Sequence, residues 1–332
     1  MRKLFLLGVM ALAASLMLSG CSTDDQDPEP TVDPTDILPT ETQPPVEGDP
    51  VLLTSIDDIF VDGVFGEDPD IDGPFPFYVE QTMSRVIIEG TGVPVEEEVA
   101  VELHYVGMNG RTGEIFDSSY ASQQSMIAIN GSFVEGFNKS LTGQKAGSRV
   151  LMVITSADAY DPDGNDQAGI MPGDTLLFVV DILKAQYVGP TGQHLADGNA
   201  WVTVTDSNGI PTAKVVPGKP APTTLQTTVL TQGTGPAVLS TDVIYVNYFT
   251  MDYATGKYIE NSYLTGVPEA DLLANLIPGW RQALVGKAAG SRVLIIVPGS
   301  LAYPQGNATP AITPNATLVC IVDLLFAFQP SA

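Results

Sequence analysis

The sequence contains very little histidine and cysteine, the residues from which many catalytic and metal sites are built. Two of each occur among 332 residues, and no HExxH, CxxC, GxSxG or glycine-rich phosphate-binding motif is present. Hydrolysis, metal catalysis and nucleotide binding therefore lack their usual residues. We expect neither a metal site nor a cofactor.

Basic residues are also scarce. Lysine and arginine number 14 against 39 acidic residues, which gives a formal charge of -25. Nucleic-acid binding depends on neutralising phosphates with basic side chains, so this balance argues against it. The acidic segment 68–72 lacks the ligand spacing of an EF-hand loop, and we interpret it as solvated.

Long hydrophobic runs are absent except near the N-terminus, where apolar and small residues extend from Leu4 to Leu18 after two basic residues. About 15 residues suit a secretory signal better than a membrane span, which needs about 20. The run is followed by SGC, and the sequence LSGC resembles a bacterial lipobox. This predicts removal of residues 1–20 and lipidation of Cys21, which would anchor the protein on the extracytoplasmic face of the cell membrane.

After lipidation of Cys21 only Cys320 remains, so an intramolecular disulfide is excluded. Cys320 lies in the apolar run LVCIVDLL and is predicted to be a core thiol. Residues 21–50 are rich in Pro, Asp, Thr and Glu, and we expect a disordered tether there. The folded part is then predicted to form two domains, 51–190 and 191–332.

An internal repeat supports this division. AGSRVL occurs at positions 146 and 289, and AY at 159 and 302, so the members of each pair are 143 positions apart. One residue lost after the tyrosine shifts the match of TLLFVVDIL at 175 with TLVCIVDLL at 317 to 142 positions. Two copies of one domain are predicted.

The residue pattern within a copy favours strands. Apolar residues alternate with acidic or polar ones from 99 to 105, and β-branched runs of strand length follow at 150–154 and 176–183. One short helix fits in each copy, at Phe137–Thr142 and at Trp280–Val285, each stopped by a glycine. We predict the α+β class, with an antiparallel sheet wrapped over one short helix per domain. AWVTVTD and VDGVFGEDPD suggest an additional strand before each domain.

Large apolar side chains recur where strands and loops of the first copy would converge. Spacing alone leaves open whether they form a ligand pocket or ordinary core. The set is Tyr105, Phe116, Val134, Phe137, Tyr160, Met171 and Phe178.

The order of VELHYVG, GEIFDSS, FVEGF, LTGQKAGSRV, ADAYDPDG, GIMP and DTLLFVVDIL resembles FKBP-type peptidyl-prolyl isomerases. The resemblance covers 90–186 and recurs more weakly over 233–328. Behind a lipobox, the tandem arrangement is similar to FKBP lipoproteins of Gram-positive bacteria.

The resemblance implies a shallow apolar pocket for a prolyl residue. It places Phe137 under the proline ring, gives Tyr160 a hydroxyl that donates to a ligand carbonyl, and puts Asp117 beside the pocket. Asp117 alternatively caps a turn. The implied catalytic residues of the first domain are Tyr105, Phe116, Asp117, Val134, Phe137, Tyr160, Met171 and Phe178. Ser125 or Met126 stands where the family has an aromatic wall.

The second copy departs further from the family. Ile259 and Glu260 replace the Phe-Asp pair, Cys320 replaces the aromatic residue at Phe178, and the stretch 263–276 does not align. We expect this domain to be degenerate and weakly active or inactive. Its retained pocket residues are Tyr248, Ile277, Trp280, Tyr303 and Ile312.

The resemblance implies a prolyl isomerase acting at the cell surface on proline-containing segments of exported polypeptides, mainly through the first domain. The reaction breaks no covalent bond, so it needs no nucleophile, only a pocket that favours the twisted amide over the planar one. Two alternatives remain open: a peptide-binding chaperone without catalysis, and a surface interaction module.

Overall fold

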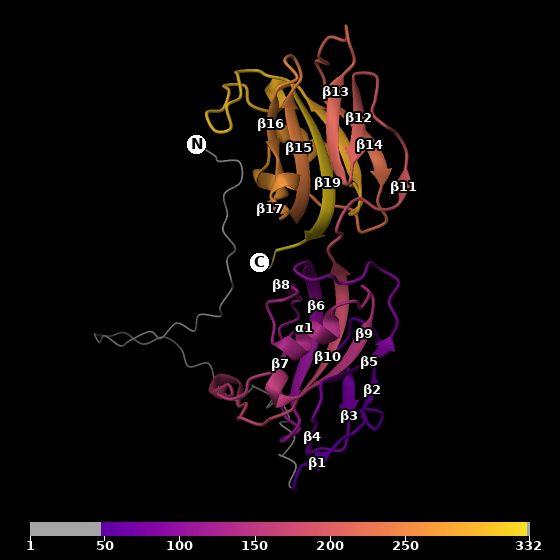
Figure 1. The fold of residues 1–332 in the computed structure, drawn as a ribbon, viewed down its shortest axis with the longest axis vertical. Helices are drawn as coiled ribbons and strands as arrows, with labels where there is room; N and C mark the ends of the chain where they lie inside the picture. Colours follow the sequence, from indigo (N-terminus) through magenta and orange to yellow (C-terminus); the bar gives the residue numbers. More distant parts are fainter. Residues whose placement is uncertain (1–47, 331–332) are drawn as a thin grey trace, which may run out of the picture.

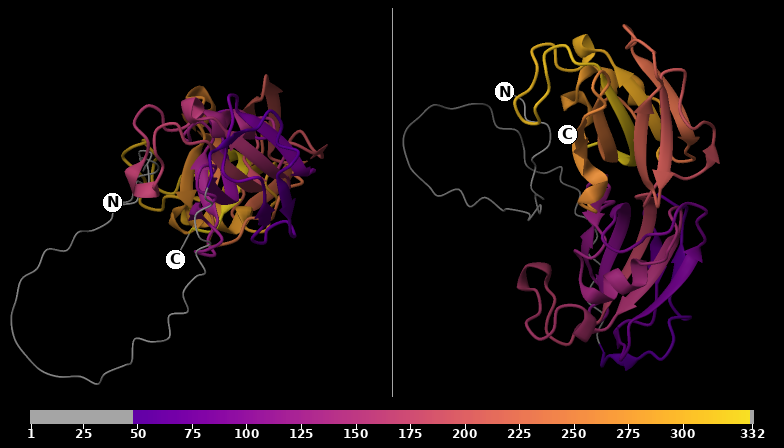
Figure 2. Two further views of the ribbon diagram at one scale, coloured as in Figure 1. Left: turned by 90° about the horizontal axis from the view of Figure 1, so that it is seen from below. Right: turned by 45° about the horizontal axis from the view of Figure 1, so that its top comes forward.

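The computed structural model describes residues 48–330; the predicted signal sequence, Cys21 and nearly all of the predicted tether lie outside them. Two sheet-based units follow one another along the long axis of the molecule (Figure 1). The right view of Figure 2 shows the same end-to-end arrangement, with the second unit drawn mainly in orange and yellow. Each unit contains one α-helix, which agrees with the predicted α+β class.

The first unit is built on an antiparallel sheet in the order β5-β9-β10-β6-β7, with β8 paired to the beginning of β6. The strands are β5 (Met83–Ile88), β6 (Ala100–Asn109), β7 (Ile115–Ser118), β8 (Met126–Ile129), β9 (Arg149–Ile154) and β10 (Leu176–Ala185). The central strands β9 and β10 are almost fully buried because both faces of the sheet are covered.

The second unit repeats this sheet in the order β11-β14-β18-β19-β15-β16, with β17 paired to β15. The strands are β11 (Gln193–His194), β14 (Gln226–Gln232), β15 (Val243–Asp252), β16 (Tyr258–Asn261), β17 (Glu269–Leu272), β18 (Arg292–Val297) and β19 (Leu318–Phe328). Short 3-10 helices occur in both units, at Ser156–Asp158 and Asp166–Ala168 in the first and at Ser262–Leu264, Leu273–Asn275 and Gly299–Leu301 in the second.

One helix packs on the inner face of each sheet, α1 (Glu135–Leu141) in the first unit and α2 (Pro278–Leu284) in the second. Both begin two residues earlier than the sequence predicts and end one residue earlier. Pro278 explains the earlier start of α2, because proline fits the first helical position, where no intrahelical N–H bond is needed.

The outer face of each sheet is covered by a short hairpin that precedes the domain core. These hairpins are β2 (Phe60–Asp62) with β3 (Asp70–Asp72), and β12 (Val202–Ser207) with β13 (Ile210–Val215). In the first unit, β1 (Val51–Leu52) and β4 (Phe77–Tyr78) form a further parallel pair. The strand predicted in AWVTVTD is β12, one arm of its hairpin, whereas VDGVFGEDPD is mainly the loop between β2 and β3. Each hairpin lies over its sheet as a separate layer.

A buried ion pair ties each hairpin to its sheet. In the first unit, Arg149 Nε lies 2.6 Å from Asp181 Oδ1, and both side chains are fully buried. Arg149 Nη2 also donates to the carbonyl oxygens of Val64 and Glu67, in the loop between β2 and β3, at 3.0 and 2.7 Å. The backbone N–H of Gly66 in turn donates to Asp181 Oδ2 at 2.6 Å.

The second unit has the same arrangement, with Arg292 donating to Asp323 at 2.6 Å and to the carbonyl oxygen of Gly209 at 2.9 Å. Arg292 also contacts Asp206, near the end of β12. Each pair is thus completed by backbone groups of a segment far away in the sequence, which satisfies charges that would be costly to leave unpaired.

The two units meet where β10 and β19 end. The backbone N–H of Tyr187 donates to the carbonyl oxygen of Leu325 at 2.9 Å, and Lys184 Nζ donates to that of Ala327 at 3.4 Å. The Tyr187 ring lies so close to Gly290 that a Cβ on this glycine would come within 3.0 Å of it. The junction is therefore a packed contact as well as a chain connection.

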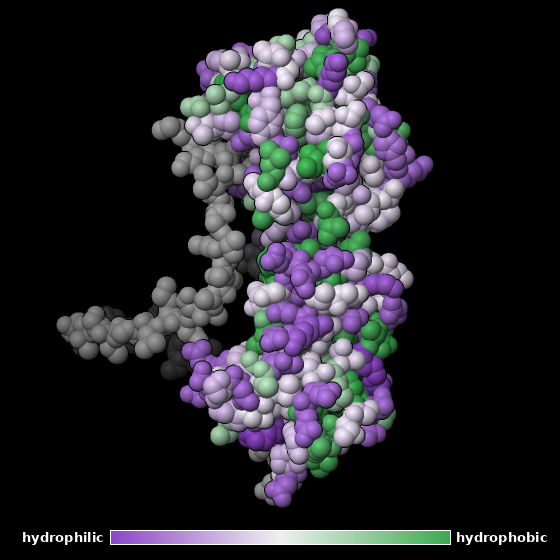
Figure 3. Space-filling model, viewed as in Figure 1, coloured by the Kyte–Doolittle hydropathy of each residue, from purple (hydrophilic) through white to green (hydrophobic). Residues whose placement is uncertain are grey.

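Hydrophilic residues are spread over the face of both units that Figure 3 shows, with hydrophobic residues in small separate groups. Within residues 48–330, every helix is too short or too polar to cross a membrane.

Candidate functional site

The floor of the candidate site in the first domain is Phe137, which α1 holds against the sheet. Its neighbour Gly136 allows this approach, because a Cβ there would lie 2.3 Å from Ile154 Cγ2 on β9. Phe137 is 3% exposed and contacts the ring of Phe133 at a centroid distance of 4.5 Å.

Two aromatic walls stand beside this floor. The ring of Phe178, on β10, meets Phe137 edge-on at 5.2 Å and Phe116, on β7, edge-on at 5.6 Å. Gly107 on β6 leaves room for both walls, since a Cβ at this position would lie 2.7 Å from Phe116 and 2.9 Å from Phe178. Edge-to-face contacts of this kind favour a fixed ring arrangement.

A hydrogen bond between Tyr105 and Asp117 forms the polar side of the site. Tyr105 Oη donates to Asp117 Oδ2 at 2.5 Å, and the backbone N–H of Tyr105 donates to Ser119 Oγ at 2.8 Å. Burial, together with the neighbouring Asp117 carboxylate, raises the pKa of Tyr105 well above its ordinary value. Tyr105 therefore remains a hydrogen-bond donor at neutral pH.

Val134 and Tyr160 pack against the same cluster, but Met171 does not join it. Met171 is 59% exposed, whereas the preceding Ile170 is 2% exposed and belongs to the core. Ile170 is held by a pair of backbone hydrogen bonds with Asn165, so its side chain turns inward and that of Met171 turns outward. The structure thus places Ile170 where the sequence analysis placed Met171.

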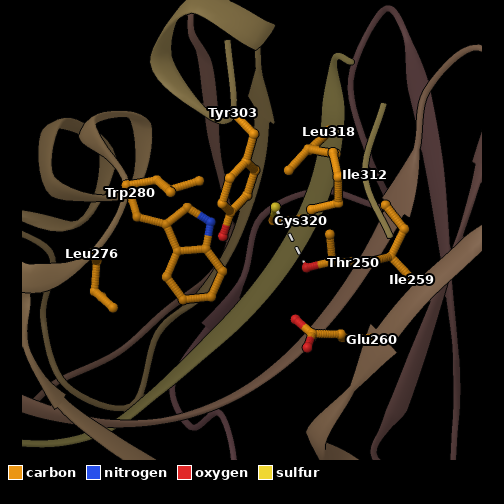
Figure 4. Close-up of a pocket in the computed structure, with 10 residues that line it drawn as sticks. Thr250, Ile259, Glu260, Leu276, Trp280, Tyr303, Ile312, Leu318 and Cys320 are labelled. Carbon is orange, nitrogen blue, oxygen red and sulfur yellow. Dashed lines mark hydrogen bonds between the residues drawn. The ribbon is translucent and has the colours of Figure 1, made fainter. Parts of the chain in front are cut away.

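The second domain contains an apolar cavity at the equivalent place. Its empty volume is about 370 Å³, part of which is open to solvent. Trp280 on α2 and Tyr303 stand on one side of the cavity, with Ile312, Leu318 and Cys320 beside them (Figure 4). Ile277 also lines it, whereas Tyr248 lies outside the lining and packs edge-on against Trp280 at 5.4 Å.

Three coordinated replacements distinguish this cavity from the aromatic site of the first domain. Thr250 occupies the position of Gly107, 143 residues earlier, and its hydroxyl donates to the sulfur of Cys320 at 3.6 Å. Ile259 and Cys320 occupy the positions of the two aromatic walls. The volume removed with the aromatic rings is thus partly filled by the threonine side chain.

Two carboxylates stand at the polar side of the second site. Tyr248 Oη lies 3.3 Å from Glu260 Oε2 and 3.4 Å from both carboxylate oxygens of Glu269. Burial raises the pKa of both glutamates, and the charge of Glu260 further raises the pKa of Glu269.

Several residues of the two sites went unnoticed in the sequence, among them Ile170, Gly107, Thr250 and Glu269. Ile170, Gly107 and Thr250 could have been found by carrying the spacing of the repeat through every position. Glu269 could not, because it lies in the stretch that does not align. The sheet register nevertheless identifies Met126 as the equivalent residue of the first domain, because Glu269 pairs with Val246 as Met126 pairs with Leu103.

One protein family and several known proteins resemble this chain in sequence. The model of the FKBP-type peptidyl-prolyl cis-trans isomerase family matches residues 92–183 and 235–325. A probable FK506-binding protein of Corynebacterium glutamicum is 35% identical over 120 residues, which span 36% of this chain and 99% of that protein. The isomerase FkpA of Escherichia coli is 37% identical over 97 residues, which span 29% of this chain and 35% of FkpA. The crystal structure of FkpA matches with a TM-score of 0.29 and 36% identity, covering 32% of this chain and 49% of that one.

Proposed function

The chain belongs to the family of FKBP-type peptidyl-prolyl cis-trans isomerases, and from this premise we propose that its first domain supplies most of the catalysis. The observation that carries the proposal is the set of aromatic contacts in that domain, where Phe178 meets Phe137 edge-on and Phe116 meets Phe178. The second domain has Ile259 and Cys320 in place of these two walls.

The chemistry needs a pocket of this kind. Rotation about a prolyl amide has to overcome a barrier of about 20 kcal/mol, because the planar amide is stabilised by resonance. An apolar enclosure disfavours the charge-separated planar form relative to the twisted one, and aromatic surfaces hold the proline ring. Tyr160 stands at the edge of the cluster, where its hydroxyl would donate to a carbonyl of the substrate.

Removing the floor of each site in the full chain tests this division. We expect Phe137→Leu to lower the rate of prolyl isomerisation in a tetrapeptide assay at least about tenfold, because contact with the twisted amide is lost. Trp280→Leu, the same change in the second domain, should alter the rate by less than about twofold. Equal losses from the two variants would refute the assignment.

Phe77→Leu is the matched control for a general loss of stability. Phe77 is 1% exposed and belongs to the same domain, but it packs in the cluster on the outer face of the sheet. If Phe77→Leu lowers the rate as much as Phe137→Leu, the loss reflects destabilisation, and the pocket assignment fails.

The second domain acts, in this proposal, mainly as a binding site for prolyl segments. The open cavity beside Trp280 and Tyr303 supports this role. Suppression of aggregation by the full chain that survives Phe137→Leu but is lost with Trp280→Leu would favour chaperone activity based on that cavity.

The proposed place of action is the extracytoplasmic face of the cell membrane, where exported polypeptides fold. The apolar run before Cys21 and the LSGC sequence support it. Labelling cells with a fatty acid should mark the wild-type protein and leave the Cys21→Ala variant unmarked. Labelling of that variant would overturn the anchoring site.

A further inference from the structure

The second domain carries a pair of acids, of which Glu260 lines the apolar cavity and Glu269 lies outside the lining. Glu260 comes from β16 and Glu269 from β17, and both approach the hydroxyl of Tyr248 at 3.3 to 3.4 Å. A phenol has one proton to donate, so it cannot satisfy two carboxylates at once. Among residues 48–330, neither glutamate forms an ion pair with a basic side chain.

This pair is not needed for the fold. In the first domain the position of Glu269 is occupied by Met126, which packs against the hydrophobic core. Half-buried like charges disfavour the folded state, so an acid that replaces an apolar residue here lowers stability. Groups that carry such a cost are candidates for binding.

The cavity next to the acids also holds donors without acceptors. Trp280 is 4% exposed, and its Nε1 has no hydrogen-bond partner among the described residues; the same holds for the hydroxyl of Tyr303. Figure 4 shows both groups facing the cavity and the carboxylate of Glu260 directed toward it from the opposite side. A ligand that fits must therefore combine an apolar body, a hydrogen-bond acceptor and a positive charge.

We propose that the second domain selects prolyl segments in which a lysine or arginine lies next to the proline. The proposal rests on the peptide-binding role given to this domain above. The proline ring would lie against Trp280, a backbone carbonyl would accept from Tyr303, and the basic side chain would lie between Glu260 and Glu269. A segment with an acidic residue beside the proline is repelled. The first domain, with Met126 in place of one acid, has no such preference.

The distribution of tryptophan in the chain gives a direct measurement. The two tryptophans, Trp201 and Trp280, both lie in the second domain, and Trp201 packs on the outer face of the sheet. In the full chain with Trp201→Phe, tryptophan fluorescence therefore reports on Trp280 alone. We would titrate this protein with three short peptides that carry Lys, Leu or Glu before proline, and with the Lys peptide in which alanine replaces proline.

We expect the Lys-Pro peptide to bind about tenfold more tightly than the Leu-Pro peptide, as a charge-assisted contact worth about 1.4 kcal/mol gives. The Glu-Pro and Lys-Ala peptides should bind more weakly than Leu-Pro. Glu269→Met should abolish the preference for lysine while leaving Leu-Pro binding within about twofold. Asp197→Asn removes one charge from an exposed position beside the outer face and should change nothing.

Acidification supplies a second test. Between pH 8 and pH 4 the preference for lysine should fall as Glu260 and Glu269 become protonated. The other titratable groups facing them do not interfere: burial raises the pKa of Cys320 to about 11, and the pKa values of Tyr248 and Tyr303 are also raised by burial.

The outcomes separate the two proposals. If no peptide changes Trp280 fluorescence, the peptide-binding role of the second domain fails, and the selectivity fails with it. If Leu-Pro binds as tightly as Lys-Pro, or if Glu269→Met leaves the preference intact, the selectivity for basic residues is overturned while peptide binding stands. If Lys-Ala binds as tightly as Lys-Pro, the site binds basic side chains without regard to proline, and the proposed selection of prolyl segments is overturned.

Discussion

Restoring the aromatic wall to the second domain should succeed only if Thr250 is removed at the same time. In the first domain a Cβ at Gly107 would lie 2.9 Å from the ring of Phe178, so an aromatic wall and a side chain at this position exclude each other. In the second domain Thr250 already contacts Cys320 at 3.6 Å. Cys320→Phe would place a ring into the space of the threonine side chain.

The size of each effect follows from this geometry. Overpacking a core typically costs about 1 to 3 kcal/mol, which is the expected loss of unfolding free energy for Cys320→Phe alone. Thr250→Gly alone should cost about 1 to 2 kcal/mol, because it leaves a gap and a glycine in the middle of a strand. The double variant should be more stable than the sum of these losses predicts, with a coupling of about 1 to 2 kcal/mol.

Urea unfolding followed by tryptophan fluorescence measures these differences in the full chain, because both tryptophans belong to the second domain. Additive effects, within about 0.5 kcal/mol, would refute the view that Thr250 compensates for the missing ring. Adding Ile259→Phe to the double variant completes the enclosure and should raise isomerisation by this domain. A fully enclosed but inactive domain would contradict the importance given to the aromatic walls.

Three further predictions concern titration and buried charge. Arg149→Met should destabilise the first domain by about 3 to 5 kcal/mol, measured by circular dichroism during urea unfolding, because the buried charge of Asp181 loses its cationic partner; an unchanged midpoint would contradict this account. Since the pKa of Glu269 is higher in the folded chain than in the unfolded one, the folded state binds protons more readily, and the melting temperature of the second domain should rise as the pH falls from neutral toward about 4.5. Glu269→Met should reduce this rise, and an equal rise in both proteins would contradict the assignment. In the Cys21→Ser background, Cys320 should react with a thiol reagent at pH 8 only as fast as the second domain unfolds, because a pKa of about 11 leaves about 0.1% thiolate; reaction faster than unfolding would show that the thiol is accessible.

Much of the fold could be predicted because the two signals that define it are local or repeated. Alternating apolar residues indicate the strands, and a constant spacing of 143 positions indicates the duplication. The hairpins on the outer faces were only partly predicted. What fixes them is the contact between a buried arginine and backbone carbonyls some 85 residues earlier, and no sequence pattern specifies such a pairing.

The structure brings the predicted aromatic residues of the first domain together, whereas the residues that were missed are those whose position depends on strand register. Ile170 and Met171 are adjacent and similar in character, yet only one side chain of an extended segment can face the core. Glu269 lies on a four-residue strand whose side chains show no alternation in burial, so neither its pairing nor its approach to Tyr248 could be inferred from the sequence.

The contacts of the two buried arginines also indicate the extent of the repeated unit. Arg149 and Arg292 are 143 positions apart, and so are Gly66 and Gly209, the glycines of the two loops that close over these ion pairs. Both copies of the domain therefore include such a hairpin as part of the repeated unit, although the sequences of the two hairpins differ. A single domain expressed alone should therefore include its hairpin, with the boundary between the two domains near Tyr187. A shorter fragment would expose the outer face of the sheet and the buried ion pair to solvent.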